Sequence, residues 1–411
     1  MPRCSGRTRW MYDFDTEIDR RAVPALKTHR IVLGEDGSDL FPGGVADMDF
    51  PAAPCVQRAI AERAAHGIFG YEAVPDGLMP ALTGWLARQH GWQVDPVHIL
   101  RAPNVLNALA MAVNAFTDPG DGILIQPPVF FDFADIIREN GRRIVENPLL
   151  LQGGRYEMDF DGLEEAARDP GTKLLLLCNP HNPVGRVWTR AELTRLGDIC
   201  RRHGVLVVSD EIHADITLPG HGYTPFASLS EADAANSVTC LSPAKSFNLA
   251  ACCSAFTVIP DAARRRALQA ANSALTVNKN NAFANVAMES AWREGDGWLD
   301  AALDYIAGNL ALVRGALAGS PVKLIEPEGT FLLWLDFRAL GLSPEALHLW
   351  LRQEAGWAIT RGVSFGPQGA GFGRLNIACP RSRLARALDS MDRALAGFAS
   401  DSDSARSQNP P

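Results

Sequence analysis

The chain has 411 residues, of which 47% are hydrophobic and 21% charged, and its formal net charge is −8. This length exceeds one ordinary hydrophobic core and predicts two domains. The acidic balance and the lack of a long Lys/Arg block argue against binding to nucleic acid or to a membrane surface. No apolar run approaches the roughly 20 residues that a membrane helix requires.

Residues 1–44 are polar and irregular, and we expect them to form an N-terminal arm and part of a small domain. A large domain is expected over residues 45–297, where helical and strand-like patterns alternate. This alternation predicts an α/β fold with a mostly parallel, doubly wound sheet. The helical patterns cover 54–65, 104–116 and 190–203, and the strand-like runs cover 123–126, 174–177, 205–208, 238–241 and 255–259.

A smaller α+β C-terminal domain is expected over residues 298–399. It begins with a long helical stretch, and a strand over 330–337 follows a turn at Gly329. The tail 400–411 is rich in Ser and Asp and is predicted to be disordered. The eight cysteines include no C-x-x-C pair, and the start of the chain lacks the apolar core of a signal peptide. We therefore expect a cytoplasmic protein, and we predict no metal site.

Three of the predicted strands end in polar residues. The first is followed by the turn Asn179 to Arg186, the second by Asp210, and the third by the run 242–248, which contains Lys245. In an open α/β sheet, the carboxyl ends of the strands border the crevice where ligands bind. An isolated lysine is usually a solvated surface residue, and an isolated aspartate is often a helix cap. The three segments together favour a shared site over these alternatives.

Pyridoxal phosphate requires such a set of residues. It needs a lysine that forms a Schiff base with its aldehyde, a carboxylate that keeps its pyridine nitrogen protonated, and a hydrogen-bond donor to its phenolate oxygen. Lys245, Asp210 and Asn182 are the candidates, in that order. The sequence therefore predicts pyridoxal phosphate as the cofactor.

With these residues in this order, the chain resembles the fold-type I pyridoxal-phosphate enzymes. Within them it resembles the MalY/PatB group of carbon–sulfur lyases. The resemblance extends from about residue 45 to about residue 386, and it implies a fold-type I transferase fold and a homodimer with shared active sites. Cystathionine β-lyase is the familiar activity of the group. The motifs that carry the resemblance are Val45 to Phe50, His66 to Tyr71, Asn179 to Arg186, Asp210 to His213, Ser242 to Asn248 and Arg374 to Arg381.

The resemblance implies a role for each of the central residues. Lys245 holds the cofactor and takes the Cα proton of the substrate as a general base. Asp210 pairs with the pyridinium nitrogen, and Asn182 donates to the phenolate oxygen. His213 stands where many relatives have a tyrosine that also touches this oxygen. The alternative for His213 is a buried histidine whose hydrogen bonds are satisfied within the core.

The phosphate group requires backbone N–H groups at a helix start, where the helix dipole favours an anion. Asn104, Val105 and Leu106 match that position. The family usually has glycine in place of Asn104, and asparagine keeps the assignment open because it tolerates left-handed backbone conformations. Ser242 would add its hydroxyl to the phosphate, and the alternative is a simple turn serine.

Three further residues are assigned by the resemblance. Phe130 matches the aromatic residue that stacks on the cofactor ring, usually a tyrosine, although an aromatic here could also be plain core. Arg374 matches the arginine that binds the substrate α-carboxylate, a role that suits its planar guanidinium. Tyr71 matches the residue that reaches the cofactor phosphate of the other subunit.

The predicted reaction is β-elimination from an L-cysteine S-conjugate, which yields a thiol, pyruvate and ammonia. The same residues would also serve an aminotransferase, or an enzyme of specialised metabolism that processes a bulky cysteine S-conjugate. A regulatory protein that retains the cofactor is a non-enzyme alternative. The sequence does not identify the thiol that leaves. The segment Asn278 to Asn281, near the expected substrate entrance, is unlike the apolar segment expected there.

Overall fold

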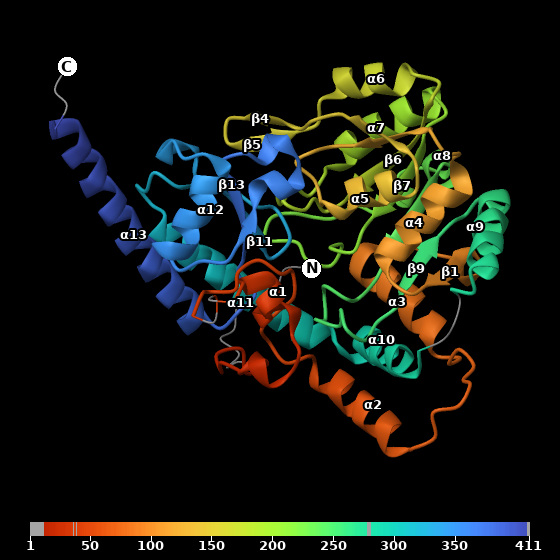
Figure 1. Cartoon of the computed structure of the whole chain (residues 1–411). Helices are drawn as coiled ribbons and strands as arrows, with labels where there is room; N and C mark the ends of the chain where they lie inside the picture. The colour runs from red at the N-terminus through yellow and green to blue at the C-terminus, as the bar shows by residue number, and fades with distance from the viewer. Residues whose placement is uncertain (1–11, 36, 38, 278–280, 409–411) are drawn as a thin grey trace.

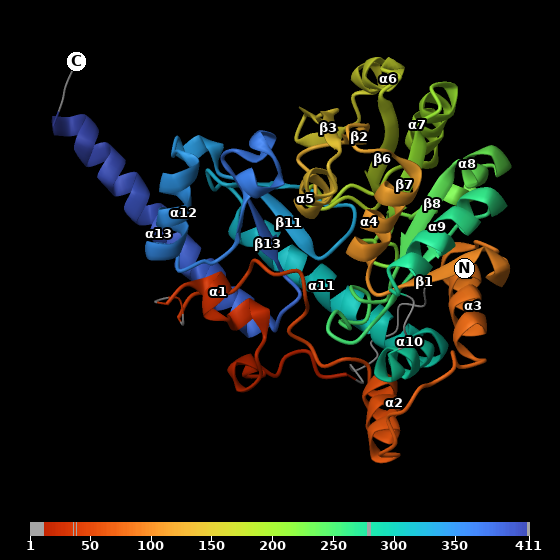
Figure 2. The same cartoon turned by 45° about the vertical axis from the view of Figure 1, so that its right-hand side comes forward.

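The computed structural model describes residues 12–35, 37, 39–277 and 281–408. Its architecture consists of two main sheets that lie side by side, each packed with helices (Figure 1). Helix α11 (Asp296–Ala316) extends from beside the smaller sheet toward helix α10 (Ala282–Glu294) (Figures 1 and 2).

The larger sheet has seven strands in the order β1-β9-β8-β7-β6-β2-β3. The strands from β8 to β3 pair in parallel, whereas β9 and β1 join in antiparallel orientation. The mostly parallel sheet confirms the predicted α/β fold class. The strands are β1 Ile99–Ala102, β2 Gly122–Ile125, β3 Arg143–Glu146, β6 Thr172–Cys178, β7 Leu206–Asp210, β8 Ser237–Leu241 and β9 Ala255–Val258.

Both faces of this sheet are buried, which explains why its strands appear as continuous apolar runs in the sequence. In β6, Leu174 and Leu176 pack into one hydrophobic cluster, and Leu175 and Leu177 pack into the cluster on the opposite face. Helices α4 (Val105–Phe116), α5 (Asp132–Glu139) and α9 (Ala262–Ala274) contribute to the first cluster, and α6 (Phe160–Arg168) and α7 (Arg190–Arg202) contribute to the second.

The smaller sheet is antiparallel, with the order β10-β11-β13-β12. Its strands are β10 Lys323–Ile325, β11 Leu332–Asp336, β12 Thr360–Arg361 and β13 Phe372–Asn376, and a separate hairpin consists of β4 Leu150–Gln152 and β5 Arg155–Glu157. The remaining helices are α1 Arg30–Leu33, α2 Pro54–Ala65, α3 Leu78–His90, α8 Glu231–Ala235, α12 Pro344–Gln353 and α13 Arg381–Gln408.

The end of the chain differs from the prediction. Helix α13 continues to Gln408, so the segment that we expected to be disordered from residue 400 is helical up to that point. Leu384, Leu388 and Met391 anchor the start of this helix in the core. A helix that is already formed extends readily, because each added residue gains a backbone hydrogen bond. Residues 409–411 lie outside the described residues, and the predicted domain boundaries stay predictions.

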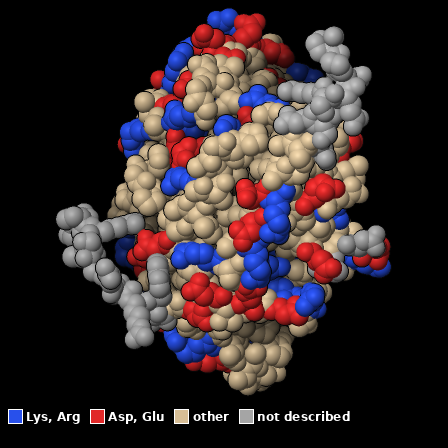
Figure 3. Space-filling model, turned by 90° about the vertical axis from the view of Figure 1, so that its left-hand side faces the viewer, with Lys and Arg blue, Asp and Glu red and all other residues tan. Residues whose placement is uncertain are grey.

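Two surface features bear on function. On the face shown in Figure 3, cationic and anionic side chains are interspersed over the surface. Helix α2 projects at the lower end of the molecule in Figures 1 and 2, and the segment that follows it carries the exposed side chains of Ile68, Phe69 and Tyr71. Among the helices in the described ranges, none combines the length and the apolarity needed to cross a bilayer.

Candidate active site

The polar residues predicted from the sequence lie at one edge of the larger sheet. Strands β6, β7 and β8 are adjacent and parallel, and their register pairs Cys178 with Asp210 and Asp210 with Cys240. Their carboxyl ends therefore meet at the same edge, with Asn182 just beyond β6 and Lys245 just beyond β8.

A cavity of about 280 Å³ opens at this edge. Nine of the ten residues predicted to bind the cofactor line it, and the tenth, Tyr71, does not. The lining residues are Ala46, Asn104, Val105, Leu106, Phe130, Cys178, Asn182, Asp210, Ile212, His213, Ser242, Ala244, Lys245, Ala250 and Cys253.

The Lys245 amine is held beside the cavity by a single main-chain acceptor. Its Nζ donates to the carbonyl oxygen of Ala46 at 2.7 Å. Burial lowers the pKa of Lys245 and the Arg374 guanidinium lowers it further, while Asp47 and Asp210 act in the opposite direction. A larger fraction of neutral amine is therefore present near pH 7 than for a solvated lysine, which favours a nucleophile or a general base.

The loop that carries Lys245 is fixed on both sides of this residue. Ser246 Oγ donates to Asp215 Oδ2 at 2.5 Å, and Asp215 also accepts from the indole of Trp85 at 2.9 Å. Asn248 adopts a left-handed conformation with φ of 56°, and its side chain bonds the main chain of Met48 through both its amide atoms. These contacts orient the lysine from behind the cavity.

Asp210 is a buried carboxylate at the end of β7, with 5% of its surface exposed. Its Oδ1 accepts from the Ile212 amide at 3.1 Å. Burial raises the pKa of Asp210 to about 6, although that hydrogen bond and the charge of Lys245 lower it. A carboxylate in this setting favours a cationic partner in the cavity.

Arg374, on β13, reaches the site from the smaller sheet. Its Nη1 donates to Asn182 Oδ1 at 2.9 Å, and its Nη2 donates to the carbonyl oxygen of Gly44 at 2.8 Å. Its Nε has no hydrogen-bond partner among the described residues. Burial lowers the pKa of Arg374 to about 9, so the guanidinium stays charged at neutral pH. Because Asn182 accepts through its oxygen, its amide nitrogen is left to donate toward the cavity.

His213 is buried, and its Nδ1 has no hydrogen-bond partner in the described part of the chain. Burial holds the pKa of His213 well below its ordinary value, and the charges of Lys245 and Arg374 lower it further. The imidazole is therefore neutral at pH 7. A histidine fully satisfied within the core, the alternative considered above, does not describe this unpartnered nitrogen.

The predicted phosphate site lies at the start of α4. Asn104 is the N-cap of this helix, and its Oδ1 accepts from the Asn107 amide at 2.8 Å. Asn104 does not use the left-handed conformation that asparagine tolerates: its φ is −158°, and it is an extended capping residue. Ser242 Oγ donates to the carbonyl oxygen of Ser254 at 2.9 Å, so its proton is used within the protein in this rotamer.

The two aromatic residues that were predicted to contact the cofactor lie in different parts of the structure. Phe130 is half-buried at the cavity wall and packs against Phe131 with ring centroids 4.9 Å apart. Tyr71 is fully exposed and away from the cavity of its own chain. Of the segment Asn278 to Asn281, residues 278–280 lie outside the described residues, and Asn281 is the N-cap of α10.

The sequence reasoning missed several contributors to the site. Ala46 supplies the acceptor for Lys245, and Cys178, Ile212, Ala250 and Cys253 line the cavity. The motif Val45 to Phe50 pointed to the segment that contains Ala46. The contact itself could not be predicted, because every residue has a main-chain carbonyl and the sequence does not show which one accepts from Lys245.

A family model for aminotransferase class I and II matches residues 44–391. The chain belongs to this family. Cystathionine beta-lyase PatB of Bacillus subtilis (strain 168) is 41% identical to it over 385 residues, which cover 93% of this chain and 100% of that protein. Protein MalY of Escherichia coli (strain K12) is 32% identical over 389 residues, with 94% and 99% coverage. These similarities confirm the resemblance to the MalY/PatB group.

Among solved structures, cystalysin from Treponema denticola, which contains a pyridoxal 5'-phosphate cofactor, is similar to this chain with a TM-score of 0.91. Its sequence is 32% identical, and the match covers 95% of this chain and 100% of that chain. The cavity described here fits the same cofactor. It presents an amine on Lys245, a buried carboxylate on Asp210 for a cationic ring nitrogen, and backbone N–H groups at the start of α4 for a phosphate.

The raised pKa of Asp210 predicts how the free energy of unfolding of the cofactor-free protein depends on pH. Between the ordinary pKa of about 4 and the folded value of about 6, the folded state binds more protons than the unfolded state. Asp210 therefore lowers the free energy of unfolding as the pH rises through this window. We expect Asp210→Asn to raise that free energy at pH 8 by up to about 3 kcal/mol and to change it little below pH 4.

Urea unfolding of the cofactor-free wild type and variant at both pH values measures this difference. The matched control is Asp392→Asn, on α13 and away from the cavity. A variant that is no more stable than the wild type at pH 8 would show that Asp210 is not held in an unfavourable buried state.

Proposed function

We propose that this chain is a pyridoxal-phosphate-dependent carbon–sulfur β-lyase that acts on L-cysteine S-conjugates. The observation that carries the proposal is the similarity to cystathionine beta-lyase PatB over the full length of that protein. The residues collected around the cavity supply the groups that this chemistry needs. When bound, pyridoxal phosphate supplies an electron sink for the electron pair left at Cα of the amino acid.

Lys245 and Asp210 would perform the central tasks. Lys245 would anchor the cofactor and then hold the proton taken from Cα, which its lowered pKa favours. Asp210 would bind the ring nitrogen and keep it protonated, because a buried carboxylate gains most from a cationic partner. With the proton on Lys245, the electron pair left at Cα would form a double bond between Cα and Cβ, and the thiolate would leave Cβ with the electron pair of the carbon–sulfur bond.

Other residues would orient the reactants. Arg374 would bind the α-carboxylate, Asn182 and His213 would contact the phenolate oxygen, and Phe130 would stack on the ring. The phosphate would be bound by the amides of Val105 and Leu106 together with Asn104 and Ser242 at the α4 end of the cavity. The hydroxyl of Ser242 would have to rotate away from Ser254 to donate there.

The chain is further proposed to form a homodimer that shares its active sites. The exposed segment after α2 places Ile68, Phe69 and Tyr71 on the surface, and their exposed fractions of 69%, 60% and 107% are high for large apolar and aromatic side chains. Tyr71 would contact the cofactor phosphate of the partner. The cytoplasmic location expected from the sequence stays a prediction.

The reaction itself is tested with L-cystathionine or an S-alkyl-L-cysteine as the sole substrate. We expect pyruvate, ammonia and free thiol in equal amounts without an added keto acid, because elimination returns the cofactor to its starting form. Lys245→Ala should release none of the three. Turnover that needs a keto acid and releases no thiol would contradict the lyase and favour an aminotransferase.

The role of Arg374 is tested by Arg374→Ala and Arg374→Lys. Hydrogen bonds to a charged group contribute about 1.5 to 3 kcal/mol, so the alanine variant should raise KM roughly 10- to 100-fold. The lysine variant should recover only part of the loss, because an ammonium cannot form the planar two-point contact. Steady-state kinetics of both variants measure this, and an unchanged KM would remove Arg374 from the substrate site.

The shared site is tested by subunit mixing. A hybrid of Tyr71→Ala and Lys245→Ala subunits has one site in which both residues are intact, if each Tyr71 serves the partner's cofactor. Random reassociation of the two inactive variants should then restore about a quarter of the wild-type activity. Lys245→Ala subunits mixed with themselves are the control, and a fully active monomer would exclude the arrangement.

A further inference from the structure

The segment Gly44 to Phe50 has no regular secondary structure, yet its carbonyl groups hold both cationic side chains of the site. The carbonyl oxygen of Gly44 accepts from Arg374 Nη2 at 2.8 Å, and that of Ala46 accepts from Lys245 Nζ at 2.7 Å. Arg374 comes from the smaller sheet and Lys245 from the larger one. The conformation of this segment therefore affects both residues at once.

Side chains, rather than a strand ladder, determine the conformation of this segment. Asn376 Nδ2 donates to the carbonyl oxygens of Val45 at 2.7 Å and Asp47 at 2.6 Å. The Met48 amide donates to Asn248 Oδ1 at 2.9 Å, and the Asp49 amide donates to the Ala378 carbonyl at 2.8 Å. Irregular backbone needs such partners, because a buried polar group left unpaired is unfavourable.

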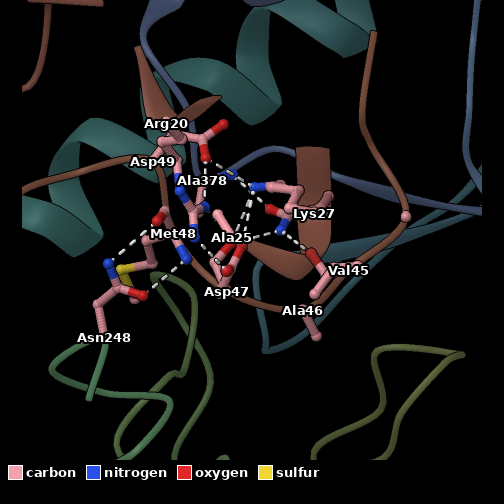
Figure 4. Close-up of polar contacts among 12 residues, drawn as sticks. Arg20, Ala25, Lys27, Val45, Ala46, Asp47, Met48, Asp49, Asn248 and Ala378 are labelled. Atoms are coloured by element: carbon pink, nitrogen blue, oxygen red, sulfur yellow. Dashed lines mark hydrogen bonds and ion pairs between the residues drawn. The ribbon is translucent and has the colours of Figure 1, made fainter. Parts of the chain in front are cut away.

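The two carboxylates of the segment bind cations from the N-terminal part of the chain (Figure 4). Arg20 Nη2 lies 2.7 Å from Asp47 Oδ2, and Arg20 Nη1 lies 2.8 Å from Asp49 Oδ1. Lys27 Nζ lies 3.2 Å from Asp47 Oδ1, 3.1 Å from Asp49 Oδ1 and 3.1 Å from the carbonyl oxygen of Asp47. Three oxygens thus surround the three donors of one ammonium.

Lys27 differs from Arg20 in burial and in its contact with the main chain. Its side chain is 2% exposed, against 21% for Arg20. A lysine is almost never buried to this degree unless it is paired, and the chain has only five lysines. Although burial would raise the pKa of Asp47, the hydrogen bond from Arg20 and the charge of Lys27 keep it below its ordinary value. The carboxylate is therefore charged at neutral pH.

We propose that Lys27 is a positioning residue for amino-acid binding: it fixes the segment Gly44 to Phe50 and thereby the two carbonyl groups that orient Arg374 and Lys245. The inference rests on the proposed roles of those two residues. Lys27 does not line the cavity. Without its ammonium, the carbonyl of Asp47 and both carboxylates lose a shared anchor, and the turn that presents Gly44 and Ala46 is free to shift.

Lys27→Met is the decisive variant, because it removes the ammonium and keeps a side chain of similar length. Arg20 and Arg383, the latter 3.4 Å from Asp49 Oδ2, remain as two cations for the two carboxylates. The variant therefore leaves the cluster balanced in charge. Lys323→Met is the matched control, because Lys323 is the exposed first residue of β10.

Two readouts separate positioning from folding. In the cofactor-free protein, hydrogen exchange of the peptide that contains Met48 and Asp49 should accelerate about 10-fold or more in Lys27→Met and stay unchanged in the control. In the holoenzyme, the affinity for L-alanine, which has no leaving group, and the KM of the substrate should each weaken about 10-fold. The cofactor affinity and the Tm should be retained, and kcat should fall about threefold or more, because the Ala46 carbonyl also orients Lys245.

Asp47→Asn is a second variant, in which Lys27 keeps Asp49 and the Asp47 carbonyl as partners; it should show the same changes to a smaller extent. Unchanged exchange and unchanged L-alanine affinity in Lys27→Met would overturn the proposal. So would losses of affinity that accompany cofactor release and a lower Tm in both variants. Because L-alanine binding needs no thiol release, failure of the lyase assay in the wild type remains distinguishable from failure of this inference.

Discussion

The in-register parallel pairing of β6, β7 and β8 is the constraint on which the site depends. It places the carboxyl ends of three adjacent strands at one edge, where Asp210 ends β7 and Asn182 and Lys245 follow the strands on either side. At this edge Asp210 is buried and Lys245 is half-buried. Burial then shifts the pKa of Asp210 upward and that of Lys245 downward, which disfavours the charged form of each.

The second requirement is a contact between the two sheets. Arg374 lies on β13 of the smaller sheet and donates to Asn182 beyond β6 of the larger one. The turn that carries Asn182 is tied to the smaller sheet's side by a buried ion pair as well, with Arg186 Nε 2.9 Å from Glu328 Oε2. Removing one partner of such a pair leaves a buried charge without compensation. The placement of Arg374 and the geometry of the turn are therefore coupled.

The segment Gly44 to Phe50 connects these parts through its main chain. Its carbonyls accept from Arg374 and Lys245, and its carboxylates bind Arg20 and Lys27. Arg20 and Lys27, neither of which lines the cavity, thereby act on Lys245, which lines it, and on Arg374, which bonds the lining residue Asn182. A similar indirect effect operates behind Lys245, where Ser246 and Asn248 hold the loop. Site geometry in this protein depends on hydrogen bonds to irregular backbone as much as on the sheet.

The sequence by itself determined the sheet, the strand ends and the family, because apolar runs buried on both faces and polar residues directly after them are local signals. It could not determine features that arise when distant segments meet. The acceptor of Lys245 is a carbonyl of Ala46, 199 residues away, and the capping conformation of Asn104 depends on how α4 begins. The buried state of Lys27 follows from its contact with Asp47 and Asp49, and nothing in the neighbouring sequence distinguishes it from a solvated lysine. Burial and main-chain contacts are properties of the tertiary structure, since they depend on which segments pack together rather than on residue type.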